Sequence, residues 1–236
     1  MKTSVLIIAH NEEKHIAACI AAVLDQSIKP YEVVVVAHNC TDRTEEIVKS
    51  YASIKLVRYS GPVGPIYARI KGFEVVAGDI VVCLDGDATP TSRTWLESIT
   101  AAFKDRKVVA VGGVVMLVNN LYTHLISMSF FYMSRFWRRD YHFYFWGANF
   151  ACRKQAYMKV GGLVPVISLS KKLKLNFIPD DIYLSLALEK EGRVLLVPHA
   201  VVTTRIPYKS FSGVKKRFLS HNQDRAKLFA YFGLKK

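Results

Sequence analysis

Residues 80–87 read Ile-Val-Val-Cys-Leu-Asp-Gly-Asp. Five consecutive apolar residues predict a strand that is covered on both faces, and Asp-Gly-Asp predicts a turn where the strand ends. Further strands are expected at residues 4–9, 31–37, 55–59 and 108–115, with helices between them at residues 12–24, 44–51, 66–77 and 93–103. This alternation predicts a doubly wound α/β sheet with helices on both faces. Such a sheet binds its ligands beyond the carboxyl ends of its strands.

The second half of the chain is less regular. Residues 146–163 have the pattern of a strand and a short helix ended by Gly161-Gly162, and residues 180–191 form a clear helical pattern. Between them, Pro165 and a lysine-rich cluster suggest a mobile loop over residues 164–178. We therefore expect one domain over residues 1–206, made of a first half (1–110) and a second half (111–206), followed by a basic amphipathic tail at 207–236.

Composition and charge narrow the possible classes of protein. The 236 residues are 51% apolar and 22% charged, which suits a packed domain and excludes global disorder. The net charge of +14 lies entirely in residues 111–236, which predicts that this half meets something anionic. The beginning of the sequence does not resemble a cleaved signal peptide, and four dispersed cysteines are typical of reduced thiols, so a cytoplasmic protein is expected.

The carboxylates after the predicted strands are candidates for binding a cation. Asp85 and Asp87 could together hold Mg²⁺ or Mn²⁺, although Asp and Gly also form simple turns. Asn11 could cap the helix after the first strand, and Asp42 with Glu45 matches a capping box. Taken one by one, Asn11 and Asp42 are explained by structure alone, and their joint occurrence is what indicates a site.

Together these motifs resemble the family 2 glycosyltransferases, inverting enzymes of the GT-A fold that use nucleotide-diphosphate sugars. The matching segments run from about residue 4 to residue 200 in the family's order. They are Ile8-Ala9-His10-Asn11-Glu12-Glu13, Thr41-Asp42, Gly64, Ala68-Arg69, Gly72, Asp85-Gly86-Asp87, Gly147-Ala148-Asn149, Arg153-Lys154, Gly161-Gly162, and Asp180-Asp181 at the start of a helix that ends at Glu191-Gly192.

The resemblance implies roles for these residues. Asp181 would be the general base, and Asp87, with Asp85 or His199, would hold the metal. Donor binding would fall to Ala9, His10, Asn11, Glu12, Asp42, Gly64, Arg69, Asp85 and Gly86, and the acceptor side to Trp146, Gly147, Asn149 and Asp180. His199 also has an ordinary structural interpretation. A polyprenyl-phosphate or other lipid-linked acceptor is expected, and it would need no base if a phosphate oxygen attacks.

Other enzyme and binding classes fit less well. The Gln-x-x-Arg-Trp motif of processive members is absent, which argues against polysaccharide synthesis. A sugar-nucleotide pyrophosphorylase needs a glycine-rich loop where this chain has His-Asn-Glu-Glu, and the same position lacks the dinucleotide fingerprint. The high pI of about 9.6 raises a nucleic-acid-binding module as an alternative, but no binding motif supports it and no nucleic-acid partner is expected.

Two segments suggest a membrane surface. Residues 121–137 are apolar and aromatic but contain too few residues to span a bilayer, and Arg138-Arg139 follows them. The tail interleaves eight Lys and Arg residues with aromatic residues. An aromatic core helix is the alternative for residues 121–137. We expect peripheral association with the anionic cytoplasmic face of a membrane.

Overall fold

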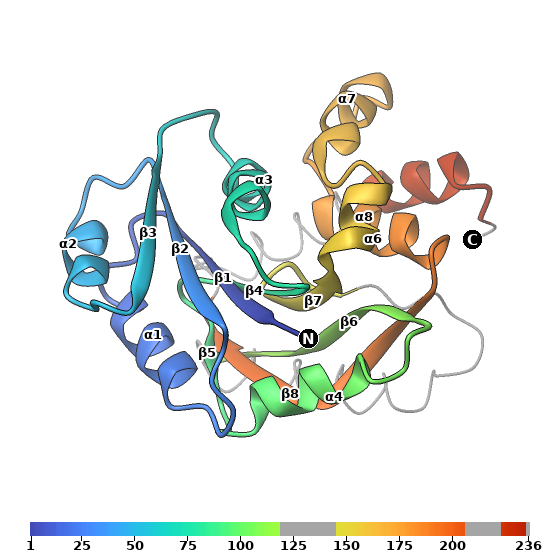
Figure 1. Cartoon of the computed structure of the whole chain (residues 1–236). Coiled ribbons are helices and arrows are strands. Elements are labelled where there is room, and N and C mark those ends of the chain that lie inside the picture. The colour runs from blue at the N-terminus through green and yellow to red at the C-terminus, as the bar shows by residue number, and fades with distance from the viewer. Residues whose placement is uncertain (119–144, 206–222, 235–236) are drawn as a thin grey trace.

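The computed structural model describes residues 1–118, 145–205 and 223–234 (Figure 1). Its centre is an eight-stranded sheet with the order β3-β2-β1-β4-β7-β6-β8-β5. The strands are β1 (Thr3–Ala9), β2 (Glu32–His38), β3 (Ile54–Tyr59), β4 (Ile80–Asp85), β5 (Thr89–Pro90), β6 (Val108–Leu117), β7 (Asn149–Arg153) and β8 (Arg193–Thr204).

The first half of the sheet follows the predicted pattern. Strands β3, β2, β1 and β4 are neighbours and run parallel. All seven residues of β1 are buried, as are five of the six in β4, because helices cover both faces of these strands. The carboxyl ends of β1, β2 and β4 therefore meet at one edge of the sheet.

Two layers of helices flank the sheet (Figure 1). The helices are α1 (Ile16–Leu24), α2 (Thr44–Lys49), α3 (Pro65–Val75), α4 (Trp95–Ala102), α6 (Lys154–Lys159), α7 (Val164–Lys172) and α8 (Asp180–Glu189). One buried cluster joins the sheet to α1, α2 and α4, and the other joins it to α3, α6, α7 and α8. Alternate residues of β1 supply the two clusters: Val5 and Ile7 belong to the cluster with α1, α2 and α4, and Leu6 and Ile8 belong to the cluster with α3, α6, α7 and α8. The helices on both faces are thus those of a doubly wound α/β fold.

The second half turns the sheet into a mixed one. Strand β7 lies antiparallel between β4 and β6, and β8 runs parallel to β6. The strand, short helix and glycine stop predicted over residues 146–163 are present as β7, α6 and two glycines with positive φ, Gly161 and Gly162.

The expectation of a mobile loop over residues 164–178 is wrong for most of its length, because α7 occupies Val164–Lys172. Pro165 lies in the first turn of that helix, where its missing N–H costs no hydrogen bond. Val166 and Leu169, three residues apart, are buried. Lys171 and Lys172 occupy the last turn, where the helix dipole favours positive charge.

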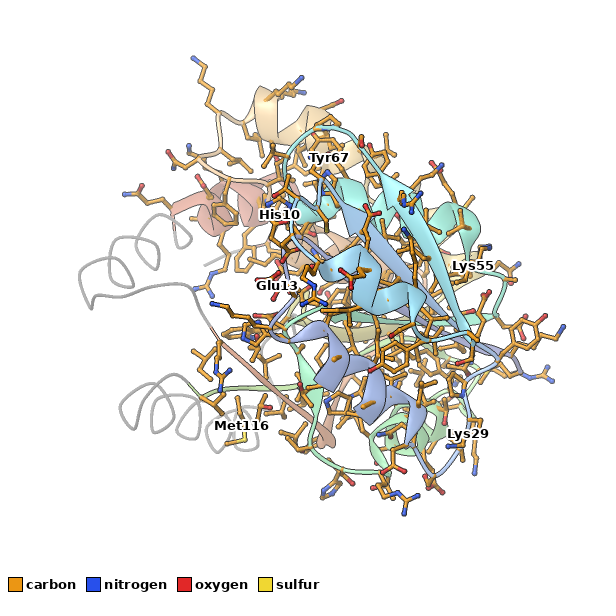
Figure 2. The ribbon with its side chains drawn as sticks, turned by 90° about the vertical axis from the view of Figure 1, so that its left-hand side faces the viewer. His10, Glu13, Lys29, Lys55, Tyr67 and Met116 are labelled. Atoms are coloured by element: carbon orange, nitrogen blue, oxygen red, sulfur yellow. The ribbon has the colours of Figure 1, made fainter. Side chains whose placement is uncertain are left out.

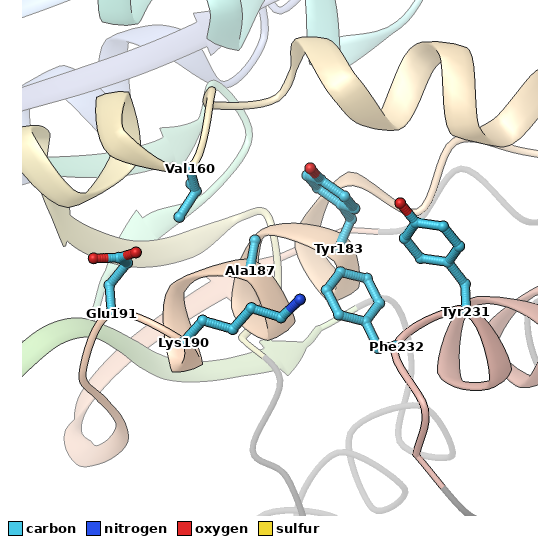
Figure 3. Close-up of a pocket in the computed structure, with 7 residues that line it drawn as sticks. All are labelled: Val160, Tyr183, Ala187, Lys190, Glu191, Tyr231 and Phe232. Carbon is cyan, nitrogen blue, oxygen red and sulfur yellow. The ribbon is translucent and has the colours of Figure 1, made fainter.

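The last described segment packs against the domain. Residues 223–231 are helical, and Leu228 within them is completely buried in the cluster that contains Tyr183 of α8. Asp224 is also fully buried, and accepts hydrogen bonds from the backbone N–H and the side chain of Asn176. Between this segment and the C-terminal half of α8 lies a hollow of about 260 Å³, where the Lys190 ammonium sits 4.8 Å from the ring centre of Phe232 (Figure 3).

Most of the two segments that were predicted to face a membrane lies outside the described residues. Residues 121–137 and 207–222 lie outside the described residues. Among the helices that the structure does describe, none has the length and apolar character needed to cross a bilayer.

Candidate active site

The candidate site lies where β1, β2 and β4 end. In the sheet register Ile8 is opposite Asp85, and Ala9 is opposite Ala37, so the loops that follow the three strands start side by side. The N–H of Gly86 donates a 2.8 Å hydrogen bond to the carbonyl of Ile8. Figure 2 shows His10 on one side of the ribbon and Lys29 on the other. Ala9, His10 and Gly86 are thus at the expected edge.

The loop after β1 is hydrogen-bonded to the loop after β2. Asn11, in a left-handed conformation at φ +56°, accepts a 2.8 Å bond from the N–H of Thr41 through its side-chain oxygen. The N–H of Glu12 donates to the Thr44 hydroxyl at 2.7 Å. Because residues 11–13 bond across the loops, α1 starts at Ile16 instead of near Glu12 as predicted.

Asp42 braces the same two loops. Its carboxylate accepts hydrogen bonds from the N–H and hydroxyl of Thr44, at 3.0 and 2.6 Å, and from the N–H of Glu13 at 3.0 Å. Burial alone would raise the pKa of Asp42, but these hydrogen bonds prevail and lower it. Asp42 thus has a structural role, but the predicted capping box is wrong, because Arg43 is the N-cap of α2 and Glu45 pairs with Arg58. A role of Asp42 in donor binding stays a prediction.

Histidine and tyrosine rings line the start of these loops. The ring of buried His38 stacks on Tyr59 with centroids 5.2 Å apart, and its backbone carbonyl lies 2.8 Å from Nδ1 of His10. The His10 ring is exposed. It therefore offers a flat, accessible surface beside the edge of the sheet.

Three carboxylates crowd the end of β4. Burial raises the pKa of Glu12, and the charges of Asp87 and Asp85 raise it further against the effect of His15. Burial also raises the pKa of Asp85, with Asp87 and Asp180 adding to the effect. The charge of Arg69 opposes the rise in the pKa of Asp85. Carboxylate oxygens gathered at one strand end suit a hard divalent cation such as Mg²⁺ or Mn²⁺. Within the described residues no three acidic, histidine or cysteine side chains could enclose a metal by themselves, so ligands from substrate or water would be needed.

Thr204, which the sequence did not single out, contacts this acidic group. Its hydroxyl donates a 2.8 Å hydrogen bond to Oδ2 of Asp87. Thr204 is the last residue of β8, and β8 pairs with the short strand β5 just after Asp87. His199 lies exposed on β8, in the stretch between Leu196 and Val201 where the pairing of β8 with β6 shifts its register. The assignment of His199 as a metal ligand therefore stays a prediction.

Arg69 occupies the centre of the site. It lies on α3, which begins just after Gly64 at φ +133° with Pro65 in its first turn. The guanidinium donates to Asp85 at 2.7 Å through Nη2 and to Asp180 through Nη1. Burial would lower the pKa of Arg69, but the charges of Asp180 and Asp85 prevail and raise it. Arg69 is only 3% exposed, so it binds these carboxylates instead of presenting its charge to a nucleotide as predicted.

The acceptor-side acids open α8. Asp180 pairs with Arg69, and Asp181 accepts a 2.8 Å hydrogen bond from the N–H of Ile182. Burial raises the pKa of Asp181 to about 6, the charge of Asp180 adds to this, and Arg69 and the backbone N–H groups of Ile182 and Gly147 oppose it. A carboxylate with a pKa in this range can accept a proton near neutral pH.

Two of the remaining acceptor-side residues differ sharply in their exposure to solvent. Trp146 is 48% exposed and free to contact a ligand. Asn149 is completely buried, accepts a hydrogen bond from the Trp95 indole at 3.1 Å and donates to the carbonyls of Val114 and Ala200. The expectation that Asn149 contacts an acceptor is wrong, because its amide holds three strands and α4 together inside the core.

Known proteins resemble this chain in sequence. The family model "Glycosyl transferase family 2" matches residues 4–161, and the chain belongs to this family. The probable glycosyltransferase YdaM of Bacillus subtilis is 30% identical over 180 residues, which cover 68% of this chain and 42% of YdaM. The glucosyl-dolichyl phosphate glucuronosyltransferase of Haloferax volcanii is 29% identical over 122 residues, or 49% of this chain and 39% of that protein. The chain thus spans less than half the length of these relatives.

A solved structure supports the predicted fold. The mannosyltransferase PcManGT of Pyrobaculum calidifontis, in complex with GDP-Man and Mn²⁺, superposes with a TM-score of 0.71 at 20% identity. The match covers 98% of this chain and 63% of PcManGT. The prediction of a GT-A type α/β fold is therefore confirmed.

Proposed function

We propose that this chain transfers a sugar from a nucleoside-diphosphate donor to an acceptor in a single inverting displacement assisted by Mg²⁺ or Mn²⁺. The observation that carries the proposal is the meeting of two acidic pairs at one sheet edge. Asp85 ends β4 and Asp87 follows in the next turn, Asp180 and Asp181 open α8, and Arg69 binds one member of each pair. Family membership and the metal-bound, nucleotide-bound relatives of the same fold agree with it.

The donor would lie between the loops after β1, β2 and β4. The exposed His10 ring offers a stacking surface for a base, and the diphosphate would lie at the acidic end of β4. Asp87 is the leading metal residue, with Asp85 and Glu12 close enough to interact with it electrostatically. A bound cation would supply the positive charge that lets a diphosphate approach these carboxylates and stabilises it as it leaves.

The acceptor would approach from the side of Asp181 and the exposed Trp146. Asp181 would take the proton of an attacking hydroxyl as its oxygen bonds to the anomeric carbon. The bond from that carbon to the diphosphate breaks on the opposite face, and its electron pair leaves with the nucleoside diphosphate. One displacement of this kind inverts the anomeric centre.

A lipid-linked acceptor is the finer part of the proposal. It is supported by the relative named glucosyl-dolichyl phosphate glucuronosyltransferase and by the basic second half of the chain. An attacking phosphate oxygen carries no proton at neutral pH, and Asp181 would then orient the acceptor instead of deprotonating it. Assays with a polyprenyl phosphate and with soluble sugars would separate these two possibilities.

Calorimetry of UDP and GDP tests the proposal directly. With Mn²⁺ present we expect binding of at least one nucleotide, and with EDTA we expect none, since the diphosphate and the carboxylates repel each other. Asp87→Asn should weaken the metal-dependent binding by at least about tenfold. Asp25→Asn, at an exposed ion pair with Arg93, is the control and should bind like the wild type. Equal affinity with and without metal would contradict the metal-assisted model.

A further inference from the structure

Arg69 links two parts of the site that are distant in the chain. Its Nη2 binds Asp85 at the end of β4, and its Nη1 binds Asp180 at the start of α8, 111 residues away from Arg69. The Arg69 side chain is 4% exposed, whereas those of Asp85 and Asp180 are 33% and 13% exposed. The guanidinium thus lies behind the carboxylates, out of reach of a ligand that approaches from solvent.

The surroundings of Arg69 leave it little freedom. A Cβ added to Gly147 would lie 2.6 Å from Nη2 and 3.0 Å from Cζ, so the chain passes closely over the guanidinium there. Gly147 also donates its N–H toward Asp181. The Nε of Arg69 is buried and has no acceptor within the described residues. Of the three guanidinium nitrogens, Nη1 binds Asp180 and Nη2 binds Asp85.

Stability alone is a weak explanation for such a bridge. Buried ion pairs lose most of their attraction to desolvation, and an unpaired buried N–H adds a further cost. What the bridge does fix is geometry, because a planar guanidinium holds two carboxylates at a set separation and angle.

We propose that Arg69 is a positioning residue that sets the distance between the metal-binding end of β4 and the catalytic base Asp181. It acts through Asp85 on one side and Asp180 on the other, and touches neither substrate. One oxygen of Asp85 binds the positively charged guanidinium of Arg69, whereas one oxygen of Asp87 binds only the neutral hydroxyl of Thr204, so Asp87 keeps more of its negative charge for a cation. This inference rests on the proposed glycosyl transfer.

Arg69→Lys tests the role while keeping the charge. A single ammonium cannot reproduce the two divergent bonds of the fork, so β4 and α8 would lose their fixed spacing. We expect kcat at saturating substrates to fall by about tenfold to a hundredfold, the scale of a misplacement of about 1 Å. The Kd for nucleotide with Mn²⁺ should stay within about threefold of the wild-type value, since Arg69 does not touch the donor. Arg58→Lys, at an exposed pair with Glu45, is the matched control and should change neither value.

Gly147→Ala provides a second probe that retains Arg69. Its methyl group would push on the guanidinium, and the same fall in kcat with retained nucleotide binding is expected. A wild-type kcat in both folded variants would overturn the inference and leave the proposed function intact. The inference would also be overturned if kcat fell only in proportion to a loss of folded protein or of nucleotide binding. Failure of the wild type to bind nucleotide or transfer sugar would overturn the proposed function, and the inference with it.

Discussion

The hydroxyl of Thr204 donates a 2.8 Å hydrogen bond to Oδ2 of Asp87 across 117 residues of sequence. Thr204 is 8% exposed, and it ends the strand that pairs with β5 immediately after the Asp-Gly-Asp turn. The bond fixes one carboxylate oxygen of Asp87 and leaves the other for a cation. Outer contacts of this kind orient metal ligands and affect metal affinity.

Replacement of Thr204 tests this contact. Thr204→Val keeps the branched shape that suits a strand but removes the donor, and we expect the affinity for nucleotide with Mn²⁺ to fall by about tenfold. Thr204→Ser should restore most of the affinity because it restores the hydroxyl. Thr203→Val, on the opposite face of the same strand, is the control. Calorimetry with Mn²⁺ measures all three, and an unchanged affinity in Thr204→Val would mean that the bond does not orient Asp87.

The pH dependence of transfer reports on Asp181. A base must be deprotonated to act, so turnover on a hydroxyl acceptor should rise with pH through the pKa of about 6 to which burial raises this carboxyl. Asp181→Asn should lower turnover by about 10²-fold or more and remove this rise, with nucleotide affinity retained. Rates at saturating donor and metal across pH 5–8 measure the effect. A variant that keeps wild-type turnover on a hydroxyl acceptor would show that Asp181 is not the base.

The buried amide of Asn149 has a structural role that a stability measurement can detect. Asn149→Leu would leave the Trp95 indole and the carbonyls of Val114 and Ala200 without their partners. We expect a loss of about 3 kcal/mol or more in the free energy of unfolding, because each buried polar group left without a hydrogen-bond partner costs about 1–3 kcal/mol. Gln155→Leu, an exposed amide on α6, should change it by less than about 0.5 kcal/mol. Denaturant titrations compare the two, and equal stability would rule out the role assigned to Asn149.

The sequence was informative where structure is local. Continuous apolar runs predicted β1, β2, β3 and β4 to within two residues at each end, and the rule that parallel strands end at one edge placed Asp87 at the site. The loop predicted over residues 164–178 failed because Pro165 was interpreted as a breaker, although a helix accepts proline in its first turn.

Long-range contacts could not be predicted from one sequence. Arg69 was expected beside the nucleotide, and its buried position depends on Asp85 and on Asp180, 111 residues away. Nothing in the sequence pairs Thr204 with Asp87, because the register of β5 and β8 decides their meeting. The sequence shows which chemical groups these side chains carry. Their partners are determined by the packing of elements that are distant in the chain.

The segment at residues 223–234 belongs to the packed domain, which Leu228 can test. This side chain is completely buried against the cluster around Tyr183, so Leu228→Ala should lower the free energy of unfolding by about 2–5 kcal/mol. Tyr231→Ala, at a side chain that is 55% exposed, should cost much less. Thermal or denaturant unfolding measures both variants. Equal stability of the two would indicate that the segment is not part of the cooperative unit.

Membrane association is best tested with charge substitutions, because deleting the tail would also remove Leu228 from the core. We expect the full chain to sediment with vesicles that contain anionic lipid and to be released by high salt, since salt screens the charge attraction. The double variant Lys215→Gln, Lys216→Gln should bind about tenfold or more weakly, at about 1 kcal/mol for each lysine near the surface. The matched control Lys104→Gln, Lys107→Gln removes two exposed charges from the electrically neutral first half and should bind like the wild type. If the full chain stays in the supernatant at low salt, the prediction of membrane association is wrong, and a soluble acceptor is favoured. An equal loss in both double variants would instead show that net charge, and not the tail, governs binding.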